Sequence, residues 1–130
     1  MPTSFLMIVT LKMQSTPLYD PHLPIKGRFV FVAAGAAGAA AYVYAIRTVN
    51  GSVAWKQATG PVNVSPTLSA DGTTLFVGSD DGNIYALEAS GGSVVWMRST
   101  GPVYHSPTLS HDGSFVFVGS GDGNIYALEA

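Results

Sequence analysis

The feature that most constrains this chain is an internal repeat with a period of 41 residues. The tetrapeptide Ser-Pro-Thr-Leu at residues 65–68 returns at residues 106–109, and the nine residues 81–89 return unchanged as residues 122–130. A fixed period of roughly 40 to 50 residues indicates supersecondary units that stack and bury each other's apolar faces. The chain is therefore expected to consist of repeated, stacked units rather than one irregular core.

Each repeat is predicted to be a meander of four antiparallel β-strands. In the middle copy, β-branched and aromatic residues gather in short segments, and turn sequences such as Ala70-Asp71-Gly72 separate the segments. No amphipathic pattern with a helical period runs long enough to indicate a helix. Four strands in a unit of about 40 residues are typical of a β-propeller blade. The predicted fold is therefore all-β, a partial β-propeller of about three four-stranded antiparallel blades. The strands expected in the middle copy are residues 62–69, 73–78, 84–88 and 93–98.

The repeat divides residues 1–130, which form a single partial propeller, into three blades. Residues 1–58 are expected to form a degenerate first blade, in which residues 4–12 are an extra N-terminal strand. Residues 59–99 form the second blade, and residues 100–130 form a third blade that lacks its last strand.

Three blades do not close a ring, because propellers have about 4 to 8 blades. The chain is therefore predicted to be a fragment of a longer propeller, a truncated gene product, or a protomer that completes its ring with other copies. In the last case, residues 4–12 of one copy would complete the last blade of another, and two copies would give six blades. Within the first copy, residues 15–18 weakly echo Ser-Pro-Thr-Leu, and the Ala/Gly run at residues 33–41 lengthens the next connection.

Composition excludes several classes of function. A net charge of −2 with only six Lys and Arg argues against a nucleic-acid binder, which would carry a basic patch. The absence of cysteine excludes disulfides and thiolate metal sites but does not fix the compartment. The uncharged residues 29–46 are a candidate membrane span by hydropathy. The repeat instead aligns them with strands of the later copies, so no membrane span is expected.

One motif carries a resemblance to a known family. The pattern Ala86-x-Glu88-x-x-x-Gly92-x-x-x-Trp96 resembles the tryptophan-docking motif of the pyrroloquinoline-quinone (PQQ) type repeat, found in quinoprotein-dehydrogenase-like propellers. The resemblance implies that these four residues lock adjacent blades together. Trp96 is accordingly expected to lie against residues 86–92 or against the next blade.

The first copy retains most of this motif. Ala45, Gly51 and Trp55 stand 41 residues before their counterparts, whereas Arg47 replaces the acidic residue. The resemblance therefore assigns Ala45, Gly51 and Trp55 the same structural docking role. The exchange at Arg47 makes the geometry of this first docking turn an open question.

The resemblance also raises the question of a cofactor. Dehydrogenases of this family bind PQQ and calcium in a pocket with a vicinal disulfide, which this chain has no cysteine to form. The Asp-Gly-Asn turns at residues 81–83 and 122–124 have some calcium-loop character, but tight hairpin turns explain them. The three histidines show no ligand spacing. No cofactor, no metal site and no catalytic residue are therefore predicted, and the chain is not expected to be an enzyme.

The predicted function is a non-catalytic propeller module, a protein-interaction or scaffold unit. Its expected partners are another protein or further propeller blades. Self-association, in which the partner is a second copy of the chain, is also expected. The alternative is a fragment of a PQQ-dependent quinoprotein dehydrogenase. Tyr104 and His105 replace Asn63 and Val64 of the previous copy, so neither stands at a repeat position. Because aromatic side chains are enriched at interfaces, these two residues are the candidate interaction surface.

Overall fold

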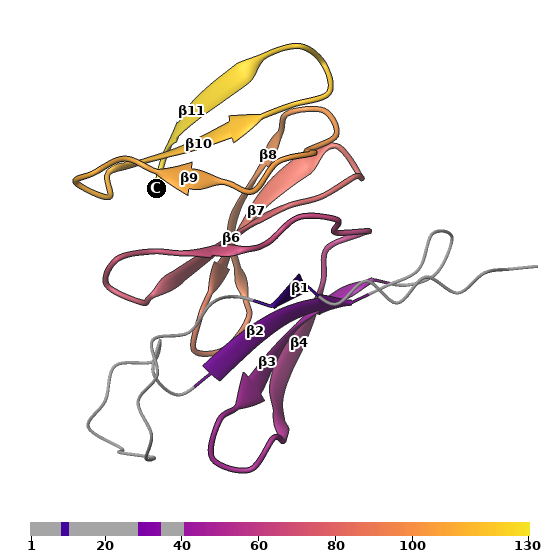
Figure 1. Ribbon diagram of the computed structural model, residues 1–130, viewed down its shortest axis with the longest axis vertical. Helices are drawn as coiled ribbons and strands as arrows, with labels where there is room; N and C mark the ends of the chain where they lie inside the picture. The colour runs from indigo at the N-terminus through magenta and orange to yellow at the C-terminus, as the bar shows by residue number, and fades with distance from the viewer. Residues whose placement is uncertain (1–8, 11–28, 35–40) are drawn as a thin grey trace, which may run out of the picture.

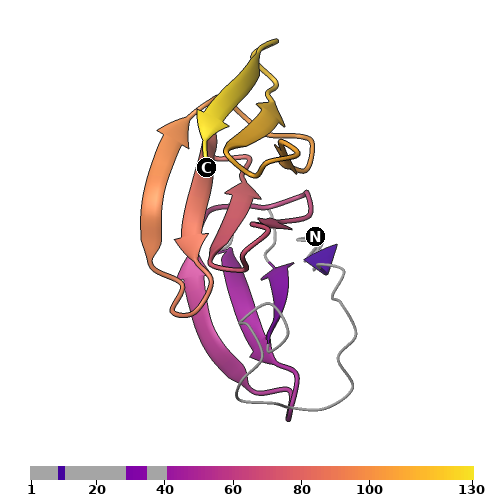
Figure 2. The same cartoon turned by 90° about the vertical axis from the view of Figure 1, so that its left-hand side faces the viewer.

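The computed structural model describes residues 9–10, 29–34 and 41–130 of the chain. Within these residues every helix or strand is a β-strand, and the strands form three antiparallel sheets. The sheets follow one another along the long axis of the molecule (Figures 1 and 2). The fold is thus an open, partial β-propeller, as the repeat predicts.

The first two sheets have four strands each and the third has three. Strands adjacent in sequence are adjacent and antiparallel within each sheet, so each sheet is a meander. The first sheet consists of β1 (Val9–Thr10), β2 (Phe29–Ala34), β3 (Tyr42–Arg47) and β4 (Val53–Ala58). The second consists of β5 (Thr67–Leu68), β6 (Thr74–Gly78), β7 (Asn83–Glu88) and β8 (Val94–Ser99). The third consists of β9 (Thr108–Leu109), β10 (Phe115–Gly119) and β11 (Ile125–Glu129).

The turn between β5 and β6 shows why these sequences form hairpins. Gly72 adopts a φ of 77°, which L-residues with a side chain rarely adopt. An Asp71 carboxylate oxygen accepts hydrogen bonds from the Ser69 hydroxyl at 2.6 Å and from the backbone N–H of Thr73 at 3.0 Å. Hydrogen bonds from Ser69 and Thr73 lower the pKa of the Asp71 carboxyl to about 2. Interactions within residues 69–73 therefore stabilise this turn.

Two apolar cores hold the three sheets together. Strand alternation places every second side chain of β2 and β3 toward the second sheet, and the same alternation repeats between the second and third sheets. Burial of these apolar faces is the main favourable contribution to the fold. The first core contains Phe31, Ala33, Val43, Ala45, Val62, Leu75, Val77, Leu87 and Ala89. The second contains Val64, Phe76, Ile84, Ala86, Val103, Val116 and Val118.

One described segment of the N-terminal region joins the first sheet. Val9–Thr10 pairs with β2 as an edge strand of that sheet, as β5 pairs with β6 at the edge of the second. The extra strand expected at residues 4–12 stays a prediction. The rest of residues 4–12, the echo at residues 15–18 and residues 35–40 of the Ala/Gly run lie outside the described residues.

The uncharged segment at residues 29–46 is split between two strands. β2 pairs with β3 over six residues, from Phe29 opposite Arg47 to Ala34 opposite Tyr42. In the part of the chain that the structure describes, no helix has the length and apolar character needed to cross a bilayer.

Candidate functional site

The motif residue Trp55 forms a contact between the first and second sheets. It lies on β4, and its indole N–H donates a hydrogen bond to the backbone carbonyl of Ala89 at 2.9 Å. Its ring also packs against Phe31 of its own sheet, with centroids 5.9 Å apart. One side chain thereby connects the outer strand of one blade to the turn that follows β7 in the next.

Gly92 provides the space for the Trp55 ring. A Cβ atom on Gly92 would lie 2.4 Å from Trp55 Cε3, closer than real Cβ contacts occur. Gly92 also has a φ of 79°, as the turn between β7 and β8 requires. Both requirements admit glycine alone, so the Trp55 ring and the Gly92 turn fit together only in the absence of a side chain at position 92.

The motif alanines lie opposite the motif tryptophans within each sheet. Ala45 pairs with Trp55, and Ala86 pairs with Trp96 in the same register. Both alanines are completely buried. Because protein interiors are close-packed, a larger side chain at either position would push the neighbouring sheet away.

The exchange of the acidic motif residue for Arg47 leaves the turn backbone unchanged. The N–H of Gly92 donates to the carbonyl of Glu88 at 2.7 Å, and the N–H of Gly51 donates to the carbonyl of Arg47 at 2.9 Å. The Glu88 carboxylate accepts a hydrogen bond from the Ser90 hydroxyl at 2.6 Å. The Arg47 guanidinium instead donates to the carbonyl of Val53 at 3.1 Å. The backbone forms this turn, and either side chain fits beside it.

Gly51 shares the conformation of Gly92 but not its contact. Its φ is 75°, yet among the described residues nothing lies within 4 Å of a Cβ atom added there. In this first turn the glycine therefore serves the backbone conformation alone.

Trp96 occupies the equivalent position in the second sheet but makes fewer contacts than Trp55. Its ring packs against Phe76 at a centroid distance of 5.9 Å, as Trp55 does against Phe31. Within the described residues its indole N–H makes no hydrogen bond, and the Arg98 guanidinium lies 5.6 Å from its ring centroid. A groove of about 380 Å³ lies beside the ring. Its lining residues are Trp96, Arg98, Ala127, Leu128, Glu129 and Ala130.

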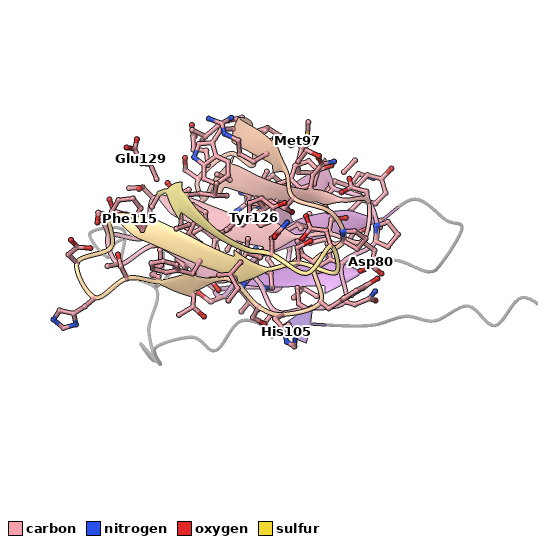
Figure 3. The ribbon with its side chains drawn as sticks, turned by 90° about the horizontal axis from the view of Figure 1, so that it is seen from above. Asp80, Met97, His105, Phe115, Tyr126 and Glu129 are labelled. Atoms are coloured by element: carbon pink, nitrogen blue, oxygen red, sulfur yellow. The ribbon has the colours of Figure 1, made fainter. Side chains whose placement is uncertain are left out.

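The candidate interaction residues lie in the loop that precedes β9. Tyr104 is 58% exposed, and one edge of its ring lies against Gly121, where an added Cβ would be 2.5 Å from Tyr104 Cε2. His105 is also exposed, and Figure 3 shows it at the periphery of the third sheet. The close contact with Gly121 holds an exposed aromatic ring in a defined orientation.

The second sheet fills the same place with a polar pair. Asn63 and Asp80 are the counterparts of Tyr104 and Gly121, and the Asn63 amide donates a hydrogen bond to the Asp80 carboxylate. The other Asp80 carboxylate oxygen is buried and has no partner among the described residues. The two exchanges, Asn63 for Tyr104 and Asp80 for Gly121, therefore compensate for each other. Sequence comparison between the copies marks both exchanges, but it does not show that they touch.

The Asp-Gly-Asn turns use their carboxylates locally. Asp81 accepts hydrogen bonds from the backbone N–H of Asn83 at 2.9 Å and from the hydroxyl of Tyr85. Burial, with a smaller contribution from the hydrogen bond to Asp81, raises the pKa of Tyr85 to about 12. Across residues 9–10, 29–34 and 41–130, no three His, Asp or Glu side chains are grouped as a metal site requires.

The comparisons with known proteins bear on this arrangement of docked sheets. The sequence profile of the family described as outer membrane protein assembly factor BamB matches residues 39–130. The chain belongs to this family of PQQ-like repeat proteins. This membership confirms the resemblance that the Trp96 motif carries.

A solved structure shows the same fold. The chain is similar to the crystal structure of BamB from Moraxella catarrhalis, with a TM-score of 0.64 and 22% sequence identity. The similarity covers 79% of this chain and 34% of that protein, so the chain spans about a third of the length of this relative. No protein with curated annotation matches the chain.

Proposed function

We propose that this chain is a non-catalytic scaffold module of BamB-like repeats that binds a partner protein. The observation that carries the proposal is the contact of Trp55 with Gly92 and Ala89. Two residues of the motif shared with quinoprotein dehydrogenases, Trp55 and Gly92, contact each other between two sheets, so the motif gives no support to a quinone site. The alternative, a dehydrogenase fragment, has no specific observation in its favour.

The class of partner is supported by the family description. An assembly factor acts on other proteins rather than on a small molecule, and the description of the matching family uses this term. The chain spans about a third of the solved relative, so the proposal extends to protein binding and not to a particular complex.

The surface proposed for the partner is the loop that carries Tyr104 and His105. An aromatic side chain that is 58% exposed and packed against Gly121 offers apolar area at little cost in conformational entropy. Neither residue stands at a repeat position, so neither is needed to dock one sheet on the next.

Site-specific photo-crosslinking tests this proposal. A photoreactive phenylalanine analogue replaces Tyr104 in one variant and His111 in the control, and each variant is expressed in cells and irradiated. His111 is a suitable control because it is exposed but lies in the turn before β10. Tyr104 contacts Gly121, which follows β10, so the two positions lie toward opposite ends of this strand. A discrete adduct from position 104 that is weak or absent from position 111 supports the proposal. Equal labelling at both positions contradicts it.

A further inference from the structure

Each sheet of this chain carries one pair of residues on one face and a different pair on the other. A Phe opposite an Ala recurs on β2 and β3, on β6 and β7, and on β10 and β11. The three cross-strand pairs are Phe31 with Ala45, Phe76 with Ala86, and Phe117 with Ala127.

The opposite face carries an aliphatic pair, whose members stand one residue before each Phe and one residue after each Ala. Because side chains alternate across a strand, these residues point away from the Phe–Ala pair of their own sheet. The three cross-strand pairs are Val30 with Ile46, Leu75 with Leu87, and Val116 with Leu128.

Both interfaces within the chain place a Phe–Ala pair against an aliphatic pair. In the first core, Phe31 and Ala45 of the first sheet lie with Leu75 and Leu87 of the second. The second core repeats this arrangement, because Phe76 and Ala86 lie with Val116 and Leu128. The chain thus makes the same type of contact twice.

The third sheet presents the next Phe–Ala pair, which no other sheet of the described residues covers. Phe117 is 40% exposed and Ile125 is 81% exposed, whereas their counterparts Phe76 and Ile84 are completely buried. Ala127 is exposed as well. This sheet lies nearest the viewer in Figure 3. Uncovered apolar faces of this kind mark binding surfaces in soluble proteins.

The matching half of the contact lies at the other end of the chain. Val30 and Ile46 point away from the second sheet, and both are only partly buried, whereas Leu75 and Leu87 are completely buried. The third sheet therefore presents one half of the repeated interface and the first sheet presents the complementary half, and no sheet within the described residues covers either.

We propose that the chain binds a second copy of itself head to tail through these two faces. The Phe117–Ala127 face of one copy lies on the Val30–Ile46 face of the other and extends the order of sheets seen within the chain. The occupant is a second copy because both halves of the contact are present in this sequence and fit each other twice already. Such a contact joins unlike surfaces, so it leaves one free face at each end of the dimer.

The experiment combines two variants, each with one face blocked. Phe117→Lys places a charge on the third-sheet face, and Ile46→Lys places a charge on the first-sheet face. Val95→Lys is the matched control, because Val95 is 60% exposed on the outer strand β8. Circular dichroism and thermal melting check that each variant folds. Ile125→Lys replaces Phe117→Lys if that variant does not fold, because Ile125 is the more exposed of the two.

Sedimentation velocity over a concentration series provides the result. The wild type and Val95→Lys are expected to self-associate, and each blocked variant is expected to sediment as a monomer. An equimolar mixture of the two blocked variants is expected to form a dimer that grows no further, since each has one intact face. A monomeric wild type, or a mixture that stays monomeric, overturns the proposal. Equal loss of association in Val95→Lys also overturns it.

Discussion

The indole N–H of Trp55 donates its hydrogen bond to the carbonyl of Ala89, 34 residues further along the chain and in the next sheet. Ala89 is completely buried, so this carbonyl has no access to water. The hydrogen bond and the contact of the same ring with Gly92 explain why the motif combines tryptophan with glycine.

Replacing Gly92 with alanine is expected to destabilise the protein more than the same change at Gly51. Both substitutions force a left-handed conformation on alanine, which costs about 1–2 kcal/mol. Only the Gly92 variant also places a methyl group against the Trp55 ring, which adds about 1–3 kcal/mol. Urea unfolding of both variants measures the difference, and equal losses of stability would show that the ring contact is unimportant.

The hydrogen bond of Trp55 is tested by phenylalanine substitution. Trp55→Phe retains an aromatic ring but leaves the buried Ala89 carbonyl unsatisfied, at a cost of about 1–3 kcal/mol. Trp96→Phe removes no hydrogen bond among the described residues, so its loss of stability is expected to be smaller. Chemical denaturation of both variants under the same conditions gives the comparison. A larger effect at Trp96 would contradict the assigned geometry.

Addition of PQQ and calcium is expected to leave the melting temperature unchanged. A ligand that binds only the folded state raises the melting temperature by mass action, in a manner that depends on its concentration. Differential scanning fluorimetry with PQQ alone, calcium alone and both together makes the measurement. A dose-dependent increase with both would favour the dehydrogenase alternative over the scaffold.

Stability is expected to decrease as the pH falls from about 4 toward 2, in part because of Asp71 and Asp112. Hydrogen bonds within their turns lower the pKa of each carboxyl to about 2, below the value near 3.9 of an unfolded chain. A depressed folded-state pKa stabilises the protein above the unfolded value, and this contribution is lost as the pH falls through the folded value. Denaturant unfolding across this range should show a steeper loss for the wild type than for the Asp71→Asn, Asp112→Asn double variant. Parallel curves would show that these turns do not contribute.

Much of the fold could be predicted from the sequence because its determinants are local. The turn at residues 69–74 forms through the side chains of Ser69, Asp71 and Thr73 together with the glycine at position 72, all within six residues. The resemblance of the Trp96 motif indicated the family, which the profile match over residues 39–130 confirms. The role of Val9–Thr10 was not predictable, because two residues pair with β2 through backbone atoms that any sequence provides.

The candidate site was likewise predictable from the sequence only in part. The exchanges at Tyr104 and Gly121 were visible as departures from the repeat, but only the folded chain shows that their atoms touch. The sequence likewise identified Trp55 and Trp96 as equivalent, whereas the structure gives Trp55 a neighbour in the next sheet and leaves a groove beside Trp96. A hydrogen bond or a groove requires a second segment, and the position of that segment depends on the packing of whole sheets.

The sequence by itself determined the period, the turns, the family and most of the strands of this protein, although the strand expected at residues 62–69 is only Thr67–Leu68. The tertiary structure alone decided which copies of a repeated residue are buried. Residues 81–89 and 122–130 are identical, yet Ile84 is completely buried and Ile125 is 81% exposed. The physical reason is that backbone conformation follows from neighbours along the chain, whereas burial follows from the sheet that lies against it.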